Sequence, residues 1–198
     1  MGKAKRKSSQ PEPESLSPLL APIQALQDLL SEFNDLGVII GGVAASLLGA
    51  PRYTVDLDAV FILNLDDIPR LLNEAARRGI QPRISDPLGF AKKNRVLLLR
   101  HIASGIDIDI SLGTLPFEIE MVERSSILEI GGVILRLPTP EDLIIMKAIA
   151  HRMKDLEDIR GIANNHPNLD RGRIQFWVKQ FGEALEMLDL WQEIEKLL

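Results

Sequence analysis

The stretch Arg52-Tyr53-Thr54-Val55-Asp56-Leu57-Asp58 places two carboxylates one residue apart in a run that favours a β-strand. Alternate side chains of a strand share a face, so Asp56 and Asp58 point the same way, while Val55 and Leu57 point toward packing. Carboxylates held so close repel each other, and a divalent cation, Mg²⁺ or Mn²⁺, is the simplest species that relieves the repulsion. The alternative is that both acids only solvate the end of a strand.

A third acid follows in a second alternating run, Ile106-Asp107-Ile108-Asp109-Ile110. Strict alternation puts Asp107 and Asp109 on the face opposite the isoleucines, in a strand that a mixed sheet could place beside Asp58. A site for two metal ions needs such a third carboxylate, because paired cations activate the attacking hydroxyl and stabilise the leaving phosphate oxygens. We expect Asp109 to be the ligand, with Asp107 as the alternative.

A glycine pair, Gly41-Gly42, stands upstream of the acids between an apolar run at 38–40 and a small-residue segment at 43–48. The pattern predicts a buried strand, a glycine turn and a helix. Glycine lets backbone amides come close to a phosphate, and the start of a helix adds positive potential. Taken alone, such a pair is more often a plain turn.

The rest of the chain predicts an α+β fold with a mixed sheet flanked by helices. Its pattern indicates helices at 18–34 (stopped by Gly37), 66–78 and 117–124, a strand at 57–63, and hairpins at 96–112 and 127–137. After Thr139-Pro140-Glu141, a good helix start, the chain is expected to be helical to its end. We therefore expect a disordered basic tail at 1–17, an α/β core at 18–138, and a helical region at 139–198 packed on the core.

The helical region carries charged residues at intervals of three or four: Lys147, His151, Lys154, Asp155 and Asp158. On one continuous helix much of this set shares a face, which can look into the cleft beside the acids. Lys147 interrupts an apolar run, where a charge must find a partner or a polar cleft. The alternative for Asp155 and Asp158 is an ordinary helix surface with salt bridges.

Composition narrows the class of protein. With 45% hydrophobic and 26% charged residues among 198, the chain can build a real core. The formal net charge of −5 gives no overall basic surface for nucleic acid, and the lack of cysteine excludes disulfides and thiolate zinc sites. Neither a secretion signal nor a membrane-spanning run is expected, so we predict a cytoplasmic protein without a membrane partner.

Together, the segments 38–44 and 52–58 and Asp109 resemble the nucleotidyltransferase superfamily, specifically its AbiEii-like branch of toxin-related proteins, over roughly 36–163. The resemblance implies a fold related to DNA polymerase beta. It also implies that Asp56, Asp58 and Asp109 are catalytic metal ligands. The implied nucleotide-binding residues are Gly41, Gly42, Arg52, Thr54 and Lys147, and further candidates are Asp107, Lys154, Asp155 and Asp158. Many superfamily members have serine in place of Gly42, so one hydrogen bond to phosphate is lost here.

These expectations describe a metal-dependent nucleotidyltransferase that moves a nucleotide from a nucleoside triphosphate to a hydroxyl acceptor. The acceptor can be a tRNA end, a protein side chain or a small molecule. The name of the branch also suggests a toxin with a cognate antitoxin, which is analogy and not chemistry. Two alternatives remain: a non-catalytic module of the same fold that binds a nucleotide, or an interaction protein.

Overall fold

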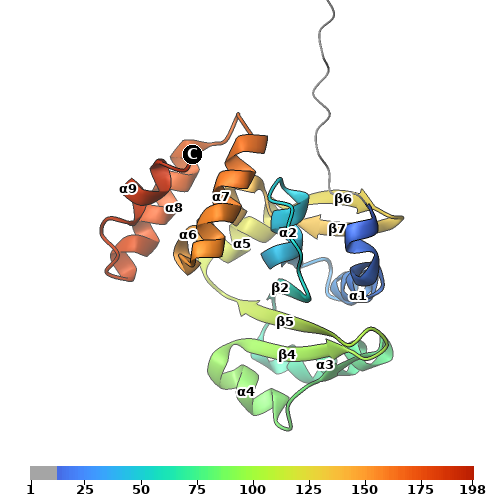
Figure 1. The fold of residues 1–198 in the computed structure, drawn as a ribbon. Helices are drawn as coiled ribbons and strands as arrows, with labels where there is room; N and C mark the ends of the chain where they lie inside the picture. The colour runs from blue at the N-terminus through green and yellow to red at the C-terminus, as the bar shows by residue number, and fades with distance from the viewer. Residues whose placement is uncertain (1–12) are drawn as a thin grey trace, which may run out of the picture.

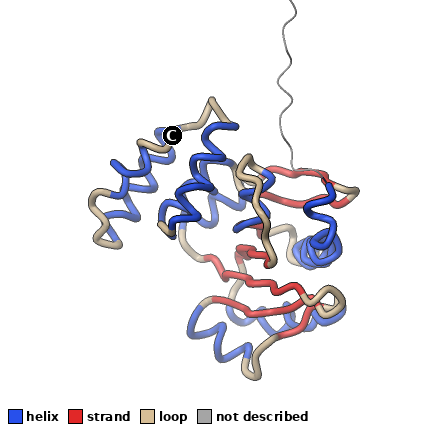
Figure 2. The backbone as a smooth tube through the Cα atoms, in the orientation of Figure 1, coloured by secondary structure: helices blue, strands red, loops and turns tan. Residues whose placement is uncertain are grey.

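The computed structural model describes residues 13–198, with side chains from residue 17 onward. Its central feature is a five-stranded mixed sheet with the order β1-β2-β5-β4-β3 (Figures 1 and 2). The strands are β1 (Gly37–Ile40), β2 (Asp56–Ile62), β3 (Ile80–Pro82), β4 (Val96–His101) and β5 (Ile106–Gly113). Strands β2 and β5 are parallel, and the other pairings are antiparallel. The expected mixed sheet is therefore confirmed.

Helices and a separate hairpin surround this sheet. The hairpin, β6 (Ser126–Ile130) and β7 (Val133–Leu137), forms its own two-stranded sheet and lies beside α1 (Pro13–Ser31) (Figure 1). Next to the sheet lie α2 (Gly41–Leu47), the short 3₁₀ helix η1 (Leu65–Asp67), α3 (Ile68–Arg77), α4 (Pro87–Asn94) and α5 (Pro116–Glu123). The chain then continues through α6 (Pro140–Ala150), α7 (Met153–Asn165), α8 (Arg171–Ala184) and α9 (Leu190–Glu195).

Helix α1 differs from its prediction at both ends. It begins at Pro13, so residues 13–17 are helical and not part of a disordered tail. Proline lacks the N–H that the first turn of a helix leaves unpaired, so Pro13 can start a helix. The rest of the expected tail, residues 1–12, lies outside the described residues.

The expected stop of α1 at Gly37 is wrong, because that residue opens β1. The helix ends at Ser31, and Asn34 and Asp35 reverse the chain with φ angles of 56° and 55°. Both side chains tolerate the left-handed region better than most. Gly37 is required for packing instead, since a Cβ there would lie 2.6 Å from the carbonyl oxygen of Val60.

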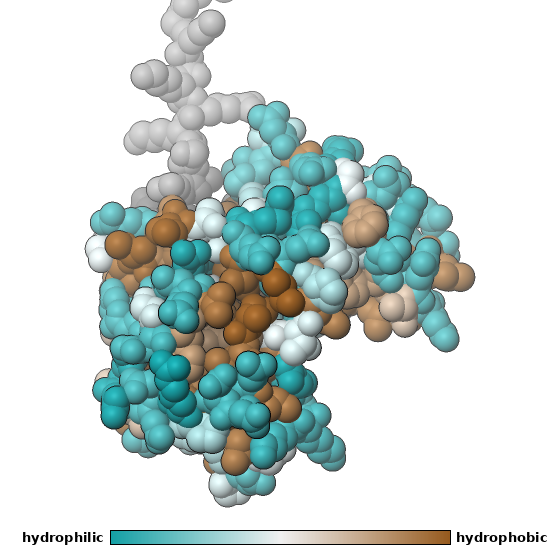
Figure 3. Space-filling model, turned by 180° about the vertical axis from the view of Figure 1, so that it is seen from behind, coloured by the Kyte–Doolittle hydropathy of each residue, from teal (hydrophilic) through white to brown (hydrophobic). Residues whose placement is uncertain are grey.

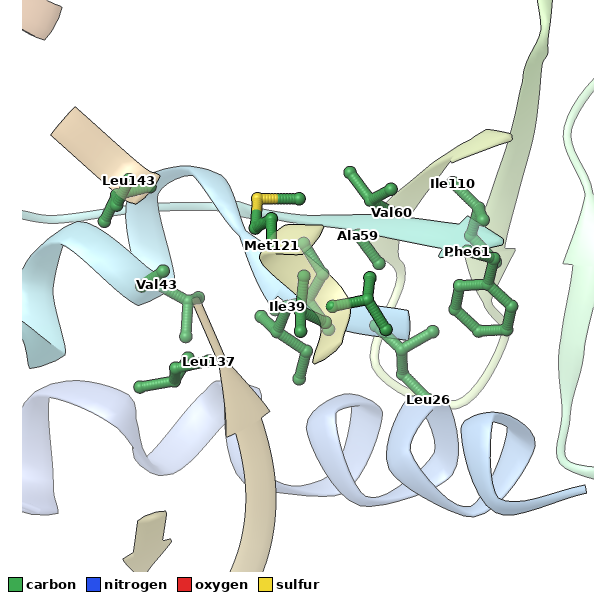
Figure 4. Packing of buried hydrophobic residues seen from close by; sticks show 14 of the residues in the cluster. Leu26, Ile39, Val43, Ala59, Val60, Phe61, Ile110, Met121, Leu137 and Leu143 are labelled. Carbon is green, nitrogen blue, oxygen red and sulfur yellow. The ribbon is translucent and has the colours of Figure 1, made fainter. Parts of the chain in front are cut away.

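The hydrophobic core joins the sheet to the helices and to the hairpin. Figure 4 shows Leu26 of α1, Ile39 of β1, Phe61 of β2 and Leu137 of β7 in this region, and all four are buried. Full burial of such a side chain contributes about 1.5–3 kcal/mol. Strand β2 is thus anchored in the core by Phe61, and Leu57, between Asp56 and Asp58, is buried as well.

The charged series in the helical region does not lie on one helix. Helix α6 ends at Ala150, the next residue His151 has a left-handed φ of 50°, and α7 begins after Arg152, whose backbone is extended. Neither glycine nor proline marks this break, so the three- and four-residue spacing carried no sign of it. Lys147 therefore belongs to α6, whereas Asp155 and Asp158 belong to α7, and the two helices pack against each other.

Strand β3 and helix α4 had no counterpart among the predicted elements. Strand β3 has only three residues and ends in proline, so it carries no alternation, and α4 has only eight. Seen from behind, the surface is mostly hydrophilic, with an apolar area near the centre of the view (Figure 3). No helix within residues 13–198 is both long and apolar enough to cross a membrane.

Candidate active site

A pocket of about 330 Å³ opens where the first residues of β2 meet α2, α6 and α7. Several expected site residues line it: Gly41, Gly42, Arg52, Asp56, Asp58, Asp109, Lys147, Lys154 and Asp155. These residues are spread over more than a hundred positions of sequence. The fold therefore gathers most of the predicted site in one place.

The register of the parallel pair β2 and β5 brings the acids together. Asp58 is paired with Asp109, and Asp56 with Asp107. Asp109 lines the pocket with Asp56 and Asp58, whereas Asp107 does not. Of the two alternatives for the third acid, Asp109 is thus the one that the fold brings into the pocket.

Two residues of the motif before the acids, Arg52 and Thr54, make hydrogen bonds to aspartates. Thr54 Oγ1 donates a hydrogen bond of 2.8 Å to Asp56 Oδ1, and Thr54 is buried. Arg52 Nε donates to Asp158 Oδ1 at 3.1 Å, so its guanidinium is anchored on α7. Thr54 does not line the pocket, and its contact indicates that it orients Asp56.

The glycine pair packs directly against this motif. Gly41 has a φ of 68°, and a Cβ there would overlap the carboxylate of Asp58. A Cβ on Gly42 would lie 2.6 Å from Thr54 Oγ1 and 3.0 Å from Arg52 Nη2. The absence of side chains at both positions therefore lets the motif come close to the start of α2.

Replacing Gly41 with alanine should destabilise the protein and displace Asp58. The left-handed backbone alone costs an alanine about 1–2 kcal/mol, and the contact with Asp58 adds to this cost. Urea denaturation measures the loss. Gly105→Ala is the matched control, because Gly105 has a φ of 73° but nothing lies within 4 Å of the place that a Cβ would take there. Equal losses in the two variants would show that Asp58 does not crowd Gly41.

A buried charge network joins α6 to α7 behind the pocket. Lys147, only 4% exposed, donates to Asp155 Oδ1 at 3.1 Å and to Asp158 Oδ2 at 2.7 Å. Arg152 Nε also donates to Asp155, at 2.5 Å. Burial acts to raise the pKa of Asp155, but the hydrogen bonds from Arg152 and Lys147 outweigh it, and the pKa is lowered. Asp155 and Asp158 are thus buried members of this network. The alternative, an ordinary helix surface with salt bridges, is therefore wrong for them.

Asp58 lies where the fold disfavours its negative charge. Its pKa is raised above the ordinary value of 3.8, first by burial and then by the negative charges of Asp56 and Asp109. The positive charges of Lys147 and Arg152 offset only part of this effect. A partly buried carboxylate with two acidic neighbours is an environment that favours a bound cation.

This pKa shift predicts a pH-dependent gain in stability for Asp58→Asn. The folded state holds the Asp58 proton more tightly than the unfolded state, so ionisation of Asp58 costs stability as the pH rises through its raised pKa. Without metal, the variant should melt above the wild type at pH 7 to 8. The difference should shrink as the pH falls toward the ordinary value of 3.8. A constant difference across this range would show that Asp58 ionises without penalty.

The two acids of β5, Asp107 and Asp109, form ion pairs with arginines that the sequence did not single out. Arg83 contacts both Asp109 and, at 3.5 Å, Asp107, while Arg100 Nε donates to Asp107 at 2.7 Å. The hydrogen bond from Arg100 lowers the pKa of Asp107. Arg83 lies 26 residues from Asp109 and follows a strand too short to recognise, so no local signal could reveal the contact.

The acids of the pocket fit a divalent cation in their chemistry. Three carboxylates line one pocket, and oxygen donors suit Mg²⁺ and Mn²⁺. Yet in the part of the chain that the structure describes, no three acidic or histidine side chains are already close enough to hold a metal ion together. The ion pair with Arg83 engages an oxygen of Asp109 that such a group would use.

Comparison with known proteins places the chain among nucleotidyl transferases. The family model described as the nucleotidyl transferase AbiEii toxin of a type IV toxin–antitoxin system matches residues 24–195. No curated protein matches the sequence significantly. An antigenic nucleotidyltransferase-like protein from Paracoccidioides brasiliensis is 17% identical, with a TM-score of 0.54 over 90% of this chain and 93% of that one. The antibiotic-resistance factor ANT(2'')-Ia is 15% identical, with a TM-score of 0.56 over 87% and 96%. At these identities, the two structures show a common fold.

Proposed function

Because the chain belongs to the AbiEii family of nucleotidyl transferases, we propose that it is a metal-dependent enzyme that transfers a nucleotide from a nucleoside triphosphate to a hydroxyl acceptor. The observation that carries this proposal is the pocket in which Asp56, Asp58 and Asp109 meet Gly41-Gly42 and Lys147. The acids suit a cation, and the glycine backbone and the ammonium of Lys147 suit a phosphate chain.

Asp56, Asp58 and Asp109 would hold Mg²⁺ or Mn²⁺. When bound, the cation would offset the charge of the phosphates and help the acceptor hydroxyl lose its proton. Thr54 keeps the carboxylate of Asp56 in place through its hydrogen bond. The raised pKa of Asp58 supports this assignment, because a site for a cation is crowded with negative charge when no cation is present.

The phosphates of the nucleotide would lie against the glycine pair and Lys147. Gly41 and Gly42 offer backbone without side chains at the pocket wall. An ammonium has three N–H donors, and two of those of Lys147 are used by Asp155 and Asp158, so one is left for a phosphate oxygen. Lys154 and Arg152 add positive charge to the same pocket.

In the proposed reaction the acceptor hydroxyl oxygen bonds to the α-phosphorus as the bond from that phosphorus to the β-phosphate oxygen breaks. Pyrophosphate leaves with the electrons of the broken bond. The hydroxyl proton passes to a carboxylate at the acceptor side, for which Asp109 is the candidate. The acceptor is a tRNA end, a protein or a small molecule, and a cognate antitoxin is a further expected partner of a chain in this family.

The test is transfer of label from each nucleoside triphosphate, labelled at the α-phosphate, to total RNA, to protein or to small hydroxyl compounds. With Mg²⁺, label should move to one acceptor class and pyrophosphate should be released, whereas a chelator should stop both. Titration calorimetry then distinguishes the non-catalytic alternative. Metal-dependent binding of a triphosphate without transfer to any acceptor would support that alternative against the proposal.

A further inference from the structure

Arg83 holds Asp109, the acid of β5 that lines the pocket. Its guanidinium pairs with Asp109 Oδ1, and both side chains remain partly exposed, at 29% and 39%. Asp109 also lines the pocket opposite Asp58 in the register. A cation bound there and the guanidinium of Arg83 would therefore compete for one carboxylate.

The three acids of the pocket lie near one another in the sheet but are not gathered as a metal site. Within residues 13–198 no group of three potential ligands stands ready for a metal ion. The register pairs Asp109 with Asp58, so the backbone is already in place. The side chain of Asp109 is paired with Arg83.

Asp107 offers Arg83 a second carboxylate partner on the same face of the sheet. Asp107 lies two residues before Asp109 on β5, and its Oδ2 is 3.5 Å from Arg83 Nη1. Arg100 occupies the other oxygen of Asp107 at 2.7 Å, which leaves Oδ2 for Arg83. The backbone N–H of Arg83 is bonded to the carbonyl of Leu98 at 3.1 Å, so only the side chain needs to move.

We propose that Arg83 is a latch on Asp109: it pairs with this carboxylate while the site holds no second cation, and shifts onto Asp107 when that cation binds. The inference rests on the proposed role of Asp109 as a metal ligand. Its consequence is that Arg83 weakens the binding of one metal ion and makes the complete site conditional on cation or substrate. Asp107, which lies outside the pocket, then pairs with Arg83 when the second cation is bound, and is not itself a metal ligand.

The test is Mn²⁺ binding to the full chain without nucleotide, monitored by the electron paramagnetic resonance signal of free Mn²⁺. Arg83→Gln should tighten the weaker of the bound ions about fivefold, the size expected for loss of a partly exposed ion pair. Arg100→Gln is the matched control, because it removes the same charge nearby without touching Asp109. Its effect should stay below about twofold, and Arg83→Lys should fall between wild type and Arg83→Gln.

An equal shift in Arg83→Gln and Arg100→Gln would show a general charge effect and overturn the latch. Unchanged or weaker binding by Arg83→Gln would overturn it as well. The proposed function fails independently: if Arg83→Gln binds Mn²⁺ more tightly but no triphosphate is ever used, the latch stands and the reaction does not. If transfer occurs while the three variants bind Mn²⁺ as the wild type does, the reaction stands and the latch does not.

Discussion

Nucleotide transfer by Asp58→Asn should be at least about 10³-fold slower than by the wild type, because asparagine keeps the shape of the side chain and removes the charge that a cation requires. Asp58 is partly buried, and the negative charges of Asp56 and Asp109 act on its carboxylate, so it lies at the centre of the acidic group. Removing one member of a catalytic group that acts as a unit typically abolishes most of its effect. Release of pyrophosphate at saturating triphosphate measures the loss.

The variant must be shown to be folded, and the expected gain in stability of Asp58→Asn at neutral pH provides this evidence within the same protein. A more stable and inactive enzyme cannot owe its inactivity to unfolding. Asp66→Asn serves as a matched control, since the same change is made at an exposed acid outside the pocket. Its rate should stay near that of the wild type. Retention of more than a tenth of the activity by Asp58→Asn would exclude Asp58 from the reaction.

The part of the site on the sheet was predictable because its geometry follows from strand periodicity. Alternation along β2 and β5 determines that Asp56 and Asp58 share a face, as do Asp107 and Asp109. The sequence left open which acid of the second pair faces the pocket. That choice depends on the register of two strands that are far apart in sequence, and here the register pairs Asp109 with Asp58.

Contacts between distant segments could not be predicted. The break between α6 and α7 has no glycine or proline, and it rests on the left-handed His151 and on Asp155, which accepts from the backbone N–H of Arg152 at 3.2 Å. Arg83 meets Asp109 only because β3, three residues long, forms the edge of the sheet. Charged side chains reach their partners through tertiary structure, which hydrophobic periodicity does not encode.

For the glycine pair, its place in the chain was predicted from the sequence, but its packing was not. Its position between a strand and a helix was predicted from the apolar run that precedes it, and β1 and α2 meet there. Its close packing on Asp58 and Thr54 was not predicted, because it depends on how β2 lies beside β1. A glycine needed for phosphate and a glycine needed for packing look the same in a sequence.

Lys147→Met should lower the free energy of unfolding by about 3–5 kcal/mol, the cost of removing one partner from a buried charge network. Methionine nearly matches the volume of lysine, so the loss reflects charge more than packing. Asp155 and Asp158 are 0% and 2% exposed, and without Lys147 each keeps one arginine. Urea denaturation with an unchanged slope would measure the loss as stability.

Lys154→Met is the matched control for this effect. Lys154 lines the same pocket, but it is exposed, so the same substitution should change stability by less than about 0.5 kcal/mol. A similar cost at both positions would indicate a general effect of lost positive charge. A loss below about 1 kcal/mol for Lys147→Met would show that the two aspartates do not depend on the ammonium.

The network should also behave as a unit. In the wild type, Asp155→Asn removes a partner of both Lys147 and Arg152, whereas in the Lys147→Met background it also removes a buried charge that has lost one of its partners. The second substitution should therefore cost less in the variant than in the wild type, with a coupling of about 1–3 kcal/mol. Because Lys147 and Asp155 belong to different helices, this coupling would measure how strongly charge, and not apolar packing alone, holds α6 and α7 around the pocket.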